Sequence, residues 1–308
     1  MKVMTKKMRW RKPWMLNNKF MPDKYTATWV SHSSMSDFLR CPRAYYLKNV
    51  YKDPKTNHKI KLVSPALSLG SAVHEVLESL SVLPKHSRFS ESLIAKFEKV
   101  WAKVSGKNGG FTGSDSEHKY KTRGQDMLRR VMNNSAPLSG LAVKIQMDLP
   151  QFWLSEEDNI ILCGKVDWLE YLPDTDSVHI IDFKTGRVEE DSKSLQLPIY
   201  HLLVHSCQKY KVSKASYWYL DSSDQLTPKE LPDLETARKS ILDVARQVKL
   251  ARQLERFKCP AGDEGCGSCR PMEAILDKKA EYVGMDEYKA DVYILNYDKE
   301  ENRDGLLL

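Results

Sequence analysis

The first third of the chain places apolar residues at helical spacing. Val73, Leu77 and Leu80, for example, share one face of a predicted helix. Polar segments at 52–65 and 105–116 separate the helical stretches and are expected to be loops. The pattern predicts four helices in this part of the chain, at residues 33–50, 67–83, 90–104 and 117–133.

From about residue 142 the pattern changes to alternation and to runs rich in Ile, Val and aromatic residues. A turn at 174–177 would join two of these runs as a hairpin. The predicted strands are 142–154, 160–172, 178–183, 214–220 and 291–295, and the predicted helices are 195–210, 234–257 and 271–276. Helices followed by a strand-rich core with a crossover helix favour an α/β domain with an N-terminal helical lobe.

Composition adds little to this picture. The 308 residues suffice for one large or two small domains, and 41% hydrophobic with 29% charged residues is typical of globular proteins. No apolar run approaches the roughly 18 residues of a membrane span, and the basic N-terminus lacks the apolar core of a signal peptide. We therefore expect a cytoplasmic protein without a membrane partner.

The net charge of +7 comes from the N-terminus. Residues 1–24 contain eight basic residues and one acid, which gives +7, so the remainder is formally neutral. We expect residues 1–30 to form a flexible basic arm. Its Trp10, Trp14 and Phe20 could stack on bases while its cations contact phosphates, and the alternative is a tail without a specific role. A neutral body does not exclude a nuclease, because bound metal ions supply positive charge at the reacting phosphate.

Two carboxylates and a lysine fall on adjacent predicted strands. Asp167 lies on 160–172, and Asp182, Phe183 and Lys184 end the next strand. Because side chains at i and i+2 share a face, Asp182 and Lys184 project together while Phe183 points into the core. Carboxylates suit Mg²⁺ or Mn²⁺, and a neighbouring lysine can stabilise developing negative charge. This combination predicts phosphodiester hydrolysis.

Five short motifs carry a family resemblance. They are Ser34-x-x-x-Phe38-x-x-Cys41-Pro42-Arg43-x-Tyr45-Tyr46, Gly70-x-x-Val73-His74-x-x-Leu77-Glu78, Gly164-x-x-Asp167, Ile181-Asp182-Phe183-Lys184-Thr185-Gly186 and Gln196-x-x-x-Tyr200. In this order they resemble the PD-(D/E)XK nuclease superfamily, and more narrowly its RecB-type and CRISPR-associated exonuclease branch, over about residues 31–276. The family's proline before the first aspartate is replaced by Val166, which removes no ligand.

The resemblance implies an architecture and a set of roles. The fold would be a restriction-endonuclease-like core, a mixed central sheet flanked by helices, with a helical lobe at about 67–135, a catalytic core at about 140–257 and a polar tail at 277–308. The side chains of His74, Asp167 and Asp182 and the carbonyl of Phe183 would bind the metal ion. Lys184 would be the catalytic lysine, and Gln196 and Tyr200 would orient it or contact the substrate.

Six cysteines suggest a second metal site. Cys266-x-x-Cys269, with Cys259 just before it, has spacing that suits metal thiolates, whereas Cys163 and Cys207 are expected to be buried free thiols. The resemblance implies that Cys41 is the fourth ligand and that Cys41, Cys259, Cys266 and Cys269 hold a 4Fe–4S cluster. The branch commonly has its third C-terminal cysteine after the pair, whereas here it precedes the pair. A four-cysteine zinc site is the alternative.

The expected function is metal-dependent hydrolysis of DNA, as a single-strand exonuclease in repair, recombination or processing. The alternatives are a non-catalytic nucleic-acid-binding or adaptor protein on the same fold, and an RNA-directed nuclease. The sequence contains no phosphate-binding G-x-x-x-x-G-K-[ST] motif, so a helicase motor or a repair complex would be a separate partner.

Overall fold

A computed structural model describes residues 22–295 of the chain. Most of the expected basic arm (1–21) and the end of the expected tail (296–308) lie outside the described residues. The helices are α1 (His32–Arg40), α2 (Pro42–Tyr45), α3 (Pro65–Glu78), α4 (Leu93–Trp101), α5 (Ser114–Asn133), α6 (Ala136–Ser139), α7 (Gln196–Cys207), α8 (Leu234–Gln253) and α9 (Arg270–Leu276). The strands are β1 (Thr28–Val30), β2 (Ile60–Leu62), β3 (Gln151–Ser155), β4 (Ile160–Cys163), β5 (Trp168–Leu172), β6 (Ser177–Lys184), β7 (Lys211–Tyr219), β8 (Thr227–Lys229), β9 (Ala280–Met285) and β10 (Asp291–Leu295).

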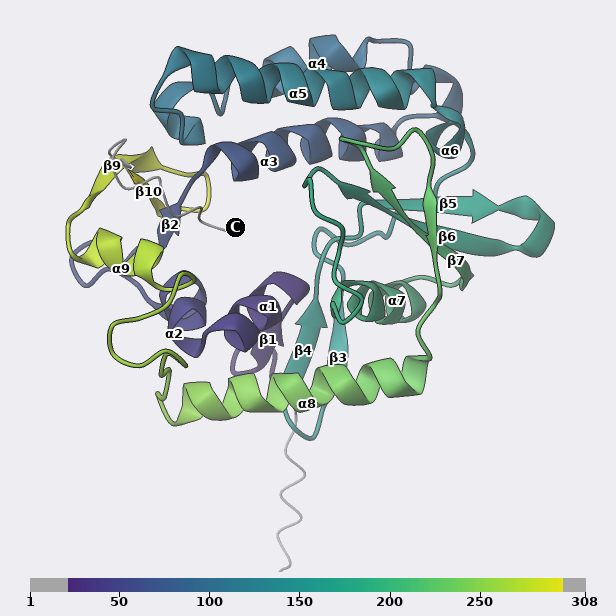
Figure 1. Cartoon of the computed structure of the whole chain (residues 1–308). Helices are drawn as coiled ribbons and strands as arrows, with labels where there is room; N and C mark the ends of the chain where they lie inside the picture. The colour runs from purple at the N-terminus through teal and green to yellow at the C-terminus, as the bar shows by residue number, and fades with distance from the viewer. Residues whose placement is uncertain (1–21, 296–308) are drawn as a thin grey trace, which may run out of the picture.

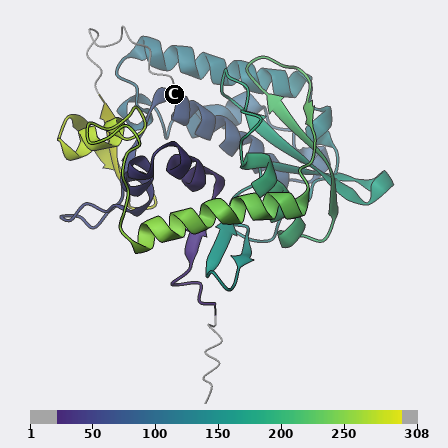
Figure 2. The same ribbon diagram turned by 60° about the horizontal axis from the view of Figure 1, so that its bottom comes forward.

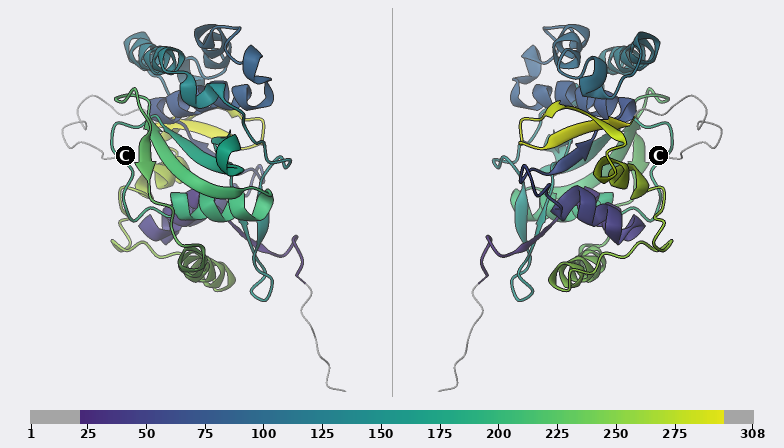
Figure 3. Two further views of the ribbon diagram at one scale, coloured as in Figure 1. Left: turned by 90° about the vertical axis from the view of Figure 1, so that its right-hand side faces the viewer. Right: turned by 90° about the vertical axis from the view of Figure 1, so that its left-hand side faces the viewer.

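The strand β6 lies inside a mixed four-stranded sheet of order β5-β6-β7-β8, antiparallel to β5 and parallel to β7. Its side chains alternate between two hydrophobic cores. Val178 and Ile180 pack with residues of α7 and α8, whereas Ile181 and Phe183 pack with residues of α3 and α5. Helices therefore cover both faces of the sheet, as Figures 1 and 3 show. The expected α/β fold is confirmed.

The predicted helix 33–50 is wrong as one element. It divides into α1, α2 and a π-helical turn at Tyr46–Val50. Pro42 cannot donate a backbone hydrogen bond, and its ring restricts the residue before it to extended conformations. Cys41 is accordingly extended (φ −164°), and its sulfur caps the start of α2 by accepting a hydrogen bond from the Ala44 backbone N–H at 3.5 Å. The break aims the Cys41 side chain away from the helix axis.

Two predicted strands are also wrong in extent. Of the predicted strand 142–154 only the last four residues form a strand, as part of β3 (Gln151–Ser155), apart from an isolated bridge between Ala142 and Glu170. The predicted strand 160–172 is two strands in different sheets, since β4 pairs with β1 and β3 whereas β5 pairs with β6. The connecting segment 164–167 is therefore irregular, and Asp167 is not on a strand.

Both ends of the described chain add strands that the sequence pattern did not predict in full. β1 falls within the expected arm 1–30 and pairs in parallel with β4. β9 and β10 fall within the expected tail 277–308 and form a sheet of order β2-β10-β9. Only β10 was predicted, because β2 and β9 are short or partly exposed and lack a clear alternation. Figure 2 shows α8 crossing the molecule near α1 and β3. None of the described helices has the length and apolar character to cross a membrane.

A buried arginine joins the helical lobe to the sheet. Arg88 is 4% exposed and makes no ion pair with any described residue. Its Nη1 donates to the carbonyls of Leu138 (2.7 Å) and Gly140 (2.5 Å), and its Nε donates to the carbonyl of Leu83 (3.3 Å). The guanidinium also lies over the ring of Trp168, 4.9 Å from its centroid. Within the described residues, the hydrogen-bond acceptors of the buried Arg88 guanidinium are backbone carbonyls. Substituting Arg88 would leave these buried carbonyls without their donor and destabilise the junction.

We expect Arg88→Met to lower the free energy of unfolding by about 3 kcal/mol, because buried carbonyls lose a charged donor. Urea denaturation followed by circular dichroism measures the change. Arg129→Met is the matched control, since Arg129 is exposed on α5 and, among residues 22–295, forms an ion pair only with Asp126 (2.6 Å). It should cost about 0.5 kcal/mol or less. Equal losses in the two variants would contradict the role of Arg88.

Candidate functional site

The side chain of Asp167 contacts β6 just beyond the point where backbone pairing between β5 and β6 ends. Pairing between β5 and β6 ends at Trp168 and Ile181. Beyond this point the Asp167 carboxylate, 9% exposed, accepts a hydrogen bond from the Phe183 backbone N–H at 2.9 Å. Because a strand residue directs its N–H and its C=O to the same side, the Phe183 carbonyl is expected to face the Asp167 side as well. The irregular segment before β5 thus brings a carboxylate to the edge of β6.

Asp182 is the most deeply buried acid of the site, at 2% exposed. Burial first, and the charge of Asp167 second, raise its pKa to about 7. Its Oδ1 accepts a hydrogen bond from Gln196 Nε2 at 3.0 Å. Its Oδ2 lies 2.9 Å from Lys184 Nζ as an ion pair, outside hydrogen-bonding geometry, and accepts no hydrogen bond within residues 22–295. One carboxylate oxygen is therefore available to a further ligand.

Lys184 is surrounded by acceptors. Its Nζ donates to Gln196 Oε1 and to Glu190 Oε2 (2.8 Å), and it lies 4.7 Å from the ring centroid of Tyr217. Burial lowers its pKa, but Asp182 and Glu190 outweigh burial, so the net pKa is raised. The ammonium is therefore charged, and it is held in place by partners on two sides.

Gln196 and Tyr200 lie one turn apart on α7 and both face Asp182. Gln196 Nε2 donates to Tyr200 Oη at 3.1 Å as well as to Asp182. Burial and the two aspartates raise the pKa of Tyr200 well above its usual range, so its hydroxyl stays protonated. The spacing that the sequence motif shows thus corresponds to a buried polar network around Asp182 and Lys184.

His74 approaches from the other side of the sheet, on α3. Its Nδ1 lies 3.3 Å from Asp167 Oδ2. Burial lowers its pKa, but the charge and hydrogen bond of Asp167 prevail and raise it to about 9. Ligand atoms of His74, Asp167 and Glu78 all lie within 4.8 Å of one another. The structure therefore unites the residues that the sequence motifs predicted for the site: His74, Asp167, Asp182, Lys184, Gln196 and Tyr200.

Two acids of this site were missed as functional candidates. Glu78 follows His74 by one helical turn, and that i, i+4 spacing was a signal that could have identified it. Burial and Asp167 raise its pKa. Glu190 lies in the irregular segment 185–195, where its N–H donates to Tyr219 Oη at 3.3 Å. No periodicity marks a loop residue of this kind, so only the fold identifies Glu190.

The donor set suits a hard divalent cation. His74, Glu78 and Asp167 bring an imidazole nitrogen and carboxylate oxygens within 4.8 Å of one another, a set of oxygen and nitrogen donors without a thiolate. Asp182 Oδ2 fits the same interpretation, because it is buried and, beyond its ion pair with Lys184, accepts no hydrogen bond within the described residues.

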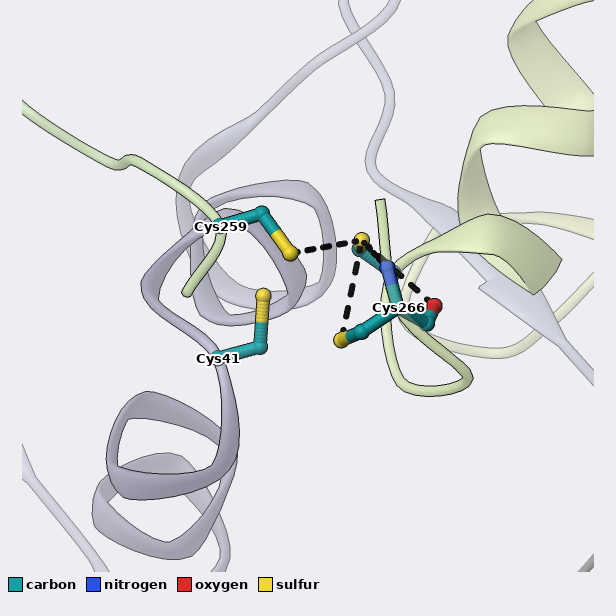
Figure 4. A group of neighbouring side chains, drawn as sticks. Cys41, Cys259 and Cys266 are labelled. Carbon is teal, nitrogen blue, oxygen red and sulfur yellow. Dashed lines mark hydrogen bonds between the residues drawn. The ribbon is translucent and has the colours of Figure 1, made fainter. Parts of the chain in front are cut away.

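The four cysteines Cys41, Cys259, Cys266 and Cys269 form a second site (Figure 4). Cys269 Sγ lies 3.8 Å from Cys259 Sγ and 3.9 Å from Cys266 Sγ, and the sulfurs of these three and Cys41 lie within 4.8 Å of one another. Burial opposes ionisation of Cys266, but the backbone N–H groups of Ser268 and Cys269 prevail and lower its pKa to about 6. Thiolates are the form that binds metals.

Cys259 joins the group of four cysteines although it precedes the Cys-x-x-Cys pair in the chain. Its different position in the sequence therefore does not keep its sulfur away from the other three. Cys163 and Cys207 stay outside it, with their sulfurs on the carbonyls of Val30 and Gln151. Arg43 anchors the surrounding loop by donating to Glu273 (2.9 Å) and to the carbonyl of Asp263 (2.9 Å).

Comparison with known proteins gives one family. The family model described as the PD-(D/E)XK nuclease superfamily matches residues 29–273, most of the chain. The match includes both the carboxylate–lysine site and the four cysteines. No curated protein matches the chain.

Proposed function

The chain belongs to the PD-(D/E)XK nuclease superfamily, and from this premise we propose that it hydrolyses phosphodiester bonds in DNA as a RecB-type single-strand exonuclease. A metal-dependent nuclease activity is the general property of this superfamily. The observation that carries the proposal is the meeting of Asp167, Asp182 and Lys184 around a buried carboxylate oxygen of Asp182, which accepts no hydrogen bond within the described residues and contacts only the Lys184 ammonium. Repair, recombination or processing of DNA would be its setting, with a helicase or a repair complex as a separate partner.

The residues that would hold a Mg²⁺ or Mn²⁺ ion are Asp167, Asp182, His74 and the carbonyl of Phe183. When bound, such an ion polarises a phosphoryl oxygen and acidifies water. Burial of Asp182 and Asp167 keeps bulk water from screening their charge. The protein thus provides a fixed anionic pair beside a fixed cation.

Lys184 would stabilise the negative charge that develops on the phosphate. Its ammonium has three hydrogens, and Asp182, Glu190 and Gln196 surround it. Of these three partners, Glu190 lies on an irregular segment. If Glu190 moved away from Lys184, one N–H of the ammonium would become free to donate to the substrate. Gln196 and Tyr200 would keep Asp182 in position through the hydrogen bonds on α7.

A non-catalytic binding or adaptor protein is the main alternative. Such a protein has no need for a lysine and two aspartates that converge below the surface, where burying charged groups costs free energy. An RNA-directed nuclease uses the same chemistry and is separated from the proposal only by its substrate.

End-labelled single-stranded DNA, double-stranded DNA and RNA of one sequence test the proposal directly. With Mn²⁺ or Mg²⁺ we expect shortening of single-stranded DNA from an end, and none with EDTA. Internal cuts would identify an endonuclease, and preferential loss of RNA would identify an RNA-directed enzyme. Binding without cleavage under all metal conditions would support the adaptor.

We also propose that the four thiolates hold a metal centre. The family resemblance implies a 4Fe–4S cluster. The sulfur spacing favours the zinc alternative, because four sulfurs about 2.3 Å from one tetrahedral ion stand about 3.8 Å apart. Anaerobic purification and elemental analysis separate the two. Iron with acid-labile sulfide identifies the cluster, zinc without iron identifies the single ion, and neither metal contradicts the proposal.

A further inference from the structure

A basic groove lies beside the end of the catalytic strand, and we propose that it binds the phosphate backbone of the nucleic-acid strand that enters or leaves the site. This inference rests on the proposed nuclease function. The groove is open, has a volume of about 620 Å³ and is lined by α5, the segment after β6 and the segment after β7.

The charge of the groove differs from that of the rest of the body. Its lining contains four cations and two acids, which gives +2: Lys119, Arg123, Arg130 and Arg187 against Asp126 and Asp221. Residues 25–308 as a whole are formally neutral, since the +7 of the chain comes from residues 1–24. A local positive excess in a neutral body attracts a polyanion.

Arg123 joins the groove to the catalytic strand. Its Nη2 donates to the carbonyl of Thr185 at 2.8 Å, and its Nε donates to Asp221 at 2.7 Å. Thr185 follows Lys184 directly. Gly70 on α3 approaches the same segment closely, since a Cβ added there would lie 3.2 Å from Thr185 Oγ1. A strand lying in the groove would therefore reach the site within one residue of Lys184.

The groove cations divide into two kinds. Arg123 and Arg130 are fixed, because each donates to an acid and to a backbone carbonyl. Lys119 is exposed and makes no ion pair within the described part of the chain. Arg187 has a side chain 77% exposed, 3.7 Å from Asp221. Lys119 and Arg187 are therefore the cations most available to phosphates.

The lining favours binding of the backbone over recognition of bases. Lys119 and Arg123 lie one turn apart on α5, about 6 Å along the helix axis. No Phe, Tyr or Trp lines the groove, so the stacking platforms typical of base recognition are missing from this surface. The groove would thus bind strands independently of their sequence, through counterion release.

The test uses the full chain with Lys119→Gln and Arg187→Gln combined. Binding of a fluorescein-labelled single-stranded oligonucleotide is followed by anisotropy in EDTA, which prevents cleavage, at several salt concentrations. We expect Kd to rise about tenfold at low salt and the magnitude of the slope of log K against log salt to fall by about 1.4, roughly 0.7 for each single-strand phosphate that the variant no longer neutralises. Lys239→Gln with Arg256→Gln is the matched control, because both residues are exposed on or next to α8, away from α5 (Figure 1). It should change neither quantity.

Hydrolysis of bis(p-nitrophenyl) phosphate, a diester too small to reach along the groove, is the second readout. The groove variant should retain the wild-type rate on it. An unchanged Kd and salt slope would overturn the inference, as would an equal loss of activity on the small diester. If the wild type hydrolyses no substrate but the groove variant binds the oligonucleotide more weakly than the wild type, the result supports the groove as a binding site and contradicts the proposed nuclease function.

Discussion

Lys184→Ala is expected to reduce the rate of DNA hydrolysis by roughly 10²–10³-fold, the effect of removing one positioned donor from a site where negative charge develops. The ammonium is charged and is held beside Asp182 and Glu190. The effect should fall on kcat with little change in KM, because the interaction strengthens only as charge develops on the phosphate. Single-turnover digestion of end-labelled DNA in Mn²⁺ measures it.

Lys229→Ala provides the control for this variant. Its Nζ lies 5.2 Å from the centroid of the same Tyr217 ring that Lys184 contacts, but it makes no ion pair with a described carboxylate. It should keep wild-type activity. Thermal unfolding of both variants separates a chemical effect from loss of the fold, since Lys184→Ala leaves Asp182 without its cation. A folded Lys184→Ala protein with wild-type activity would exclude the proposed mechanism.

Cys269→Ala is expected to release the metal of the thiolate site and to lower the melting temperature by roughly 10 °C. Cys269 is fully buried and its sulfur lies within 4 Å of two other cysteine sulfurs. A centre bound there joins Cys41 to the segment after α8, across more than two hundred residues. A cross-link that closes so long a loop stabilises by about 4–5 kcal/mol in the chain-entropy description. At about 2–4 °C for each kcal/mol this gives the expected shift.

Metal content by elemental analysis and scanning calorimetry measure the two effects. Cys207→Ala is the control, because Cys207 is a free thiol on α7 whose sulfur donates to the Gln151 carbonyl at 3.6 Å and lies outside the group of four cysteines. It should retain the metal and lose far less stability. Wild-type metal content in Cys269→Ala would show that the four cysteines are not the ligands.

The sequence predicted the elements whose signal is local. The hairpin of β5 and β6 follows from a turn between two apolar runs, and α3, α5, α7 and α8 follow from helical periodicity. Most errors occur where a distant element decides the outcome. In sequence, residues 160–172 resemble one strand. In the structure they form two strands in different sheets, because β1 and β3 pair with residues 160–163 while β6 pairs with residues 168–172. Within 33–50, by contrast, the break has a local cause in Pro42, which the helical periodicity on either side of it obscures.

The residues of the candidate site also fall into two groups, those with a local signal in the sequence and those that distant elements bring together. The sequence by itself predicted which residues would carry the chemistry, through the motifs of the family resemblance, and it determined that Asp182 and Lys184 share a strand face and Gln196 and Tyr200 a helix face, because these periods need no tertiary information. Only the tertiary structure decided how Asp167, Glu78 and Glu190 stand around them, since these acids arrive on an irregular segment, a separate helix and a loop. The meeting of Cys41 with the C-terminal cysteines is likewise a product of packing. Local periods fix a side chain's direction within one element, whereas distances between elements depend on how their apolar faces are buried together.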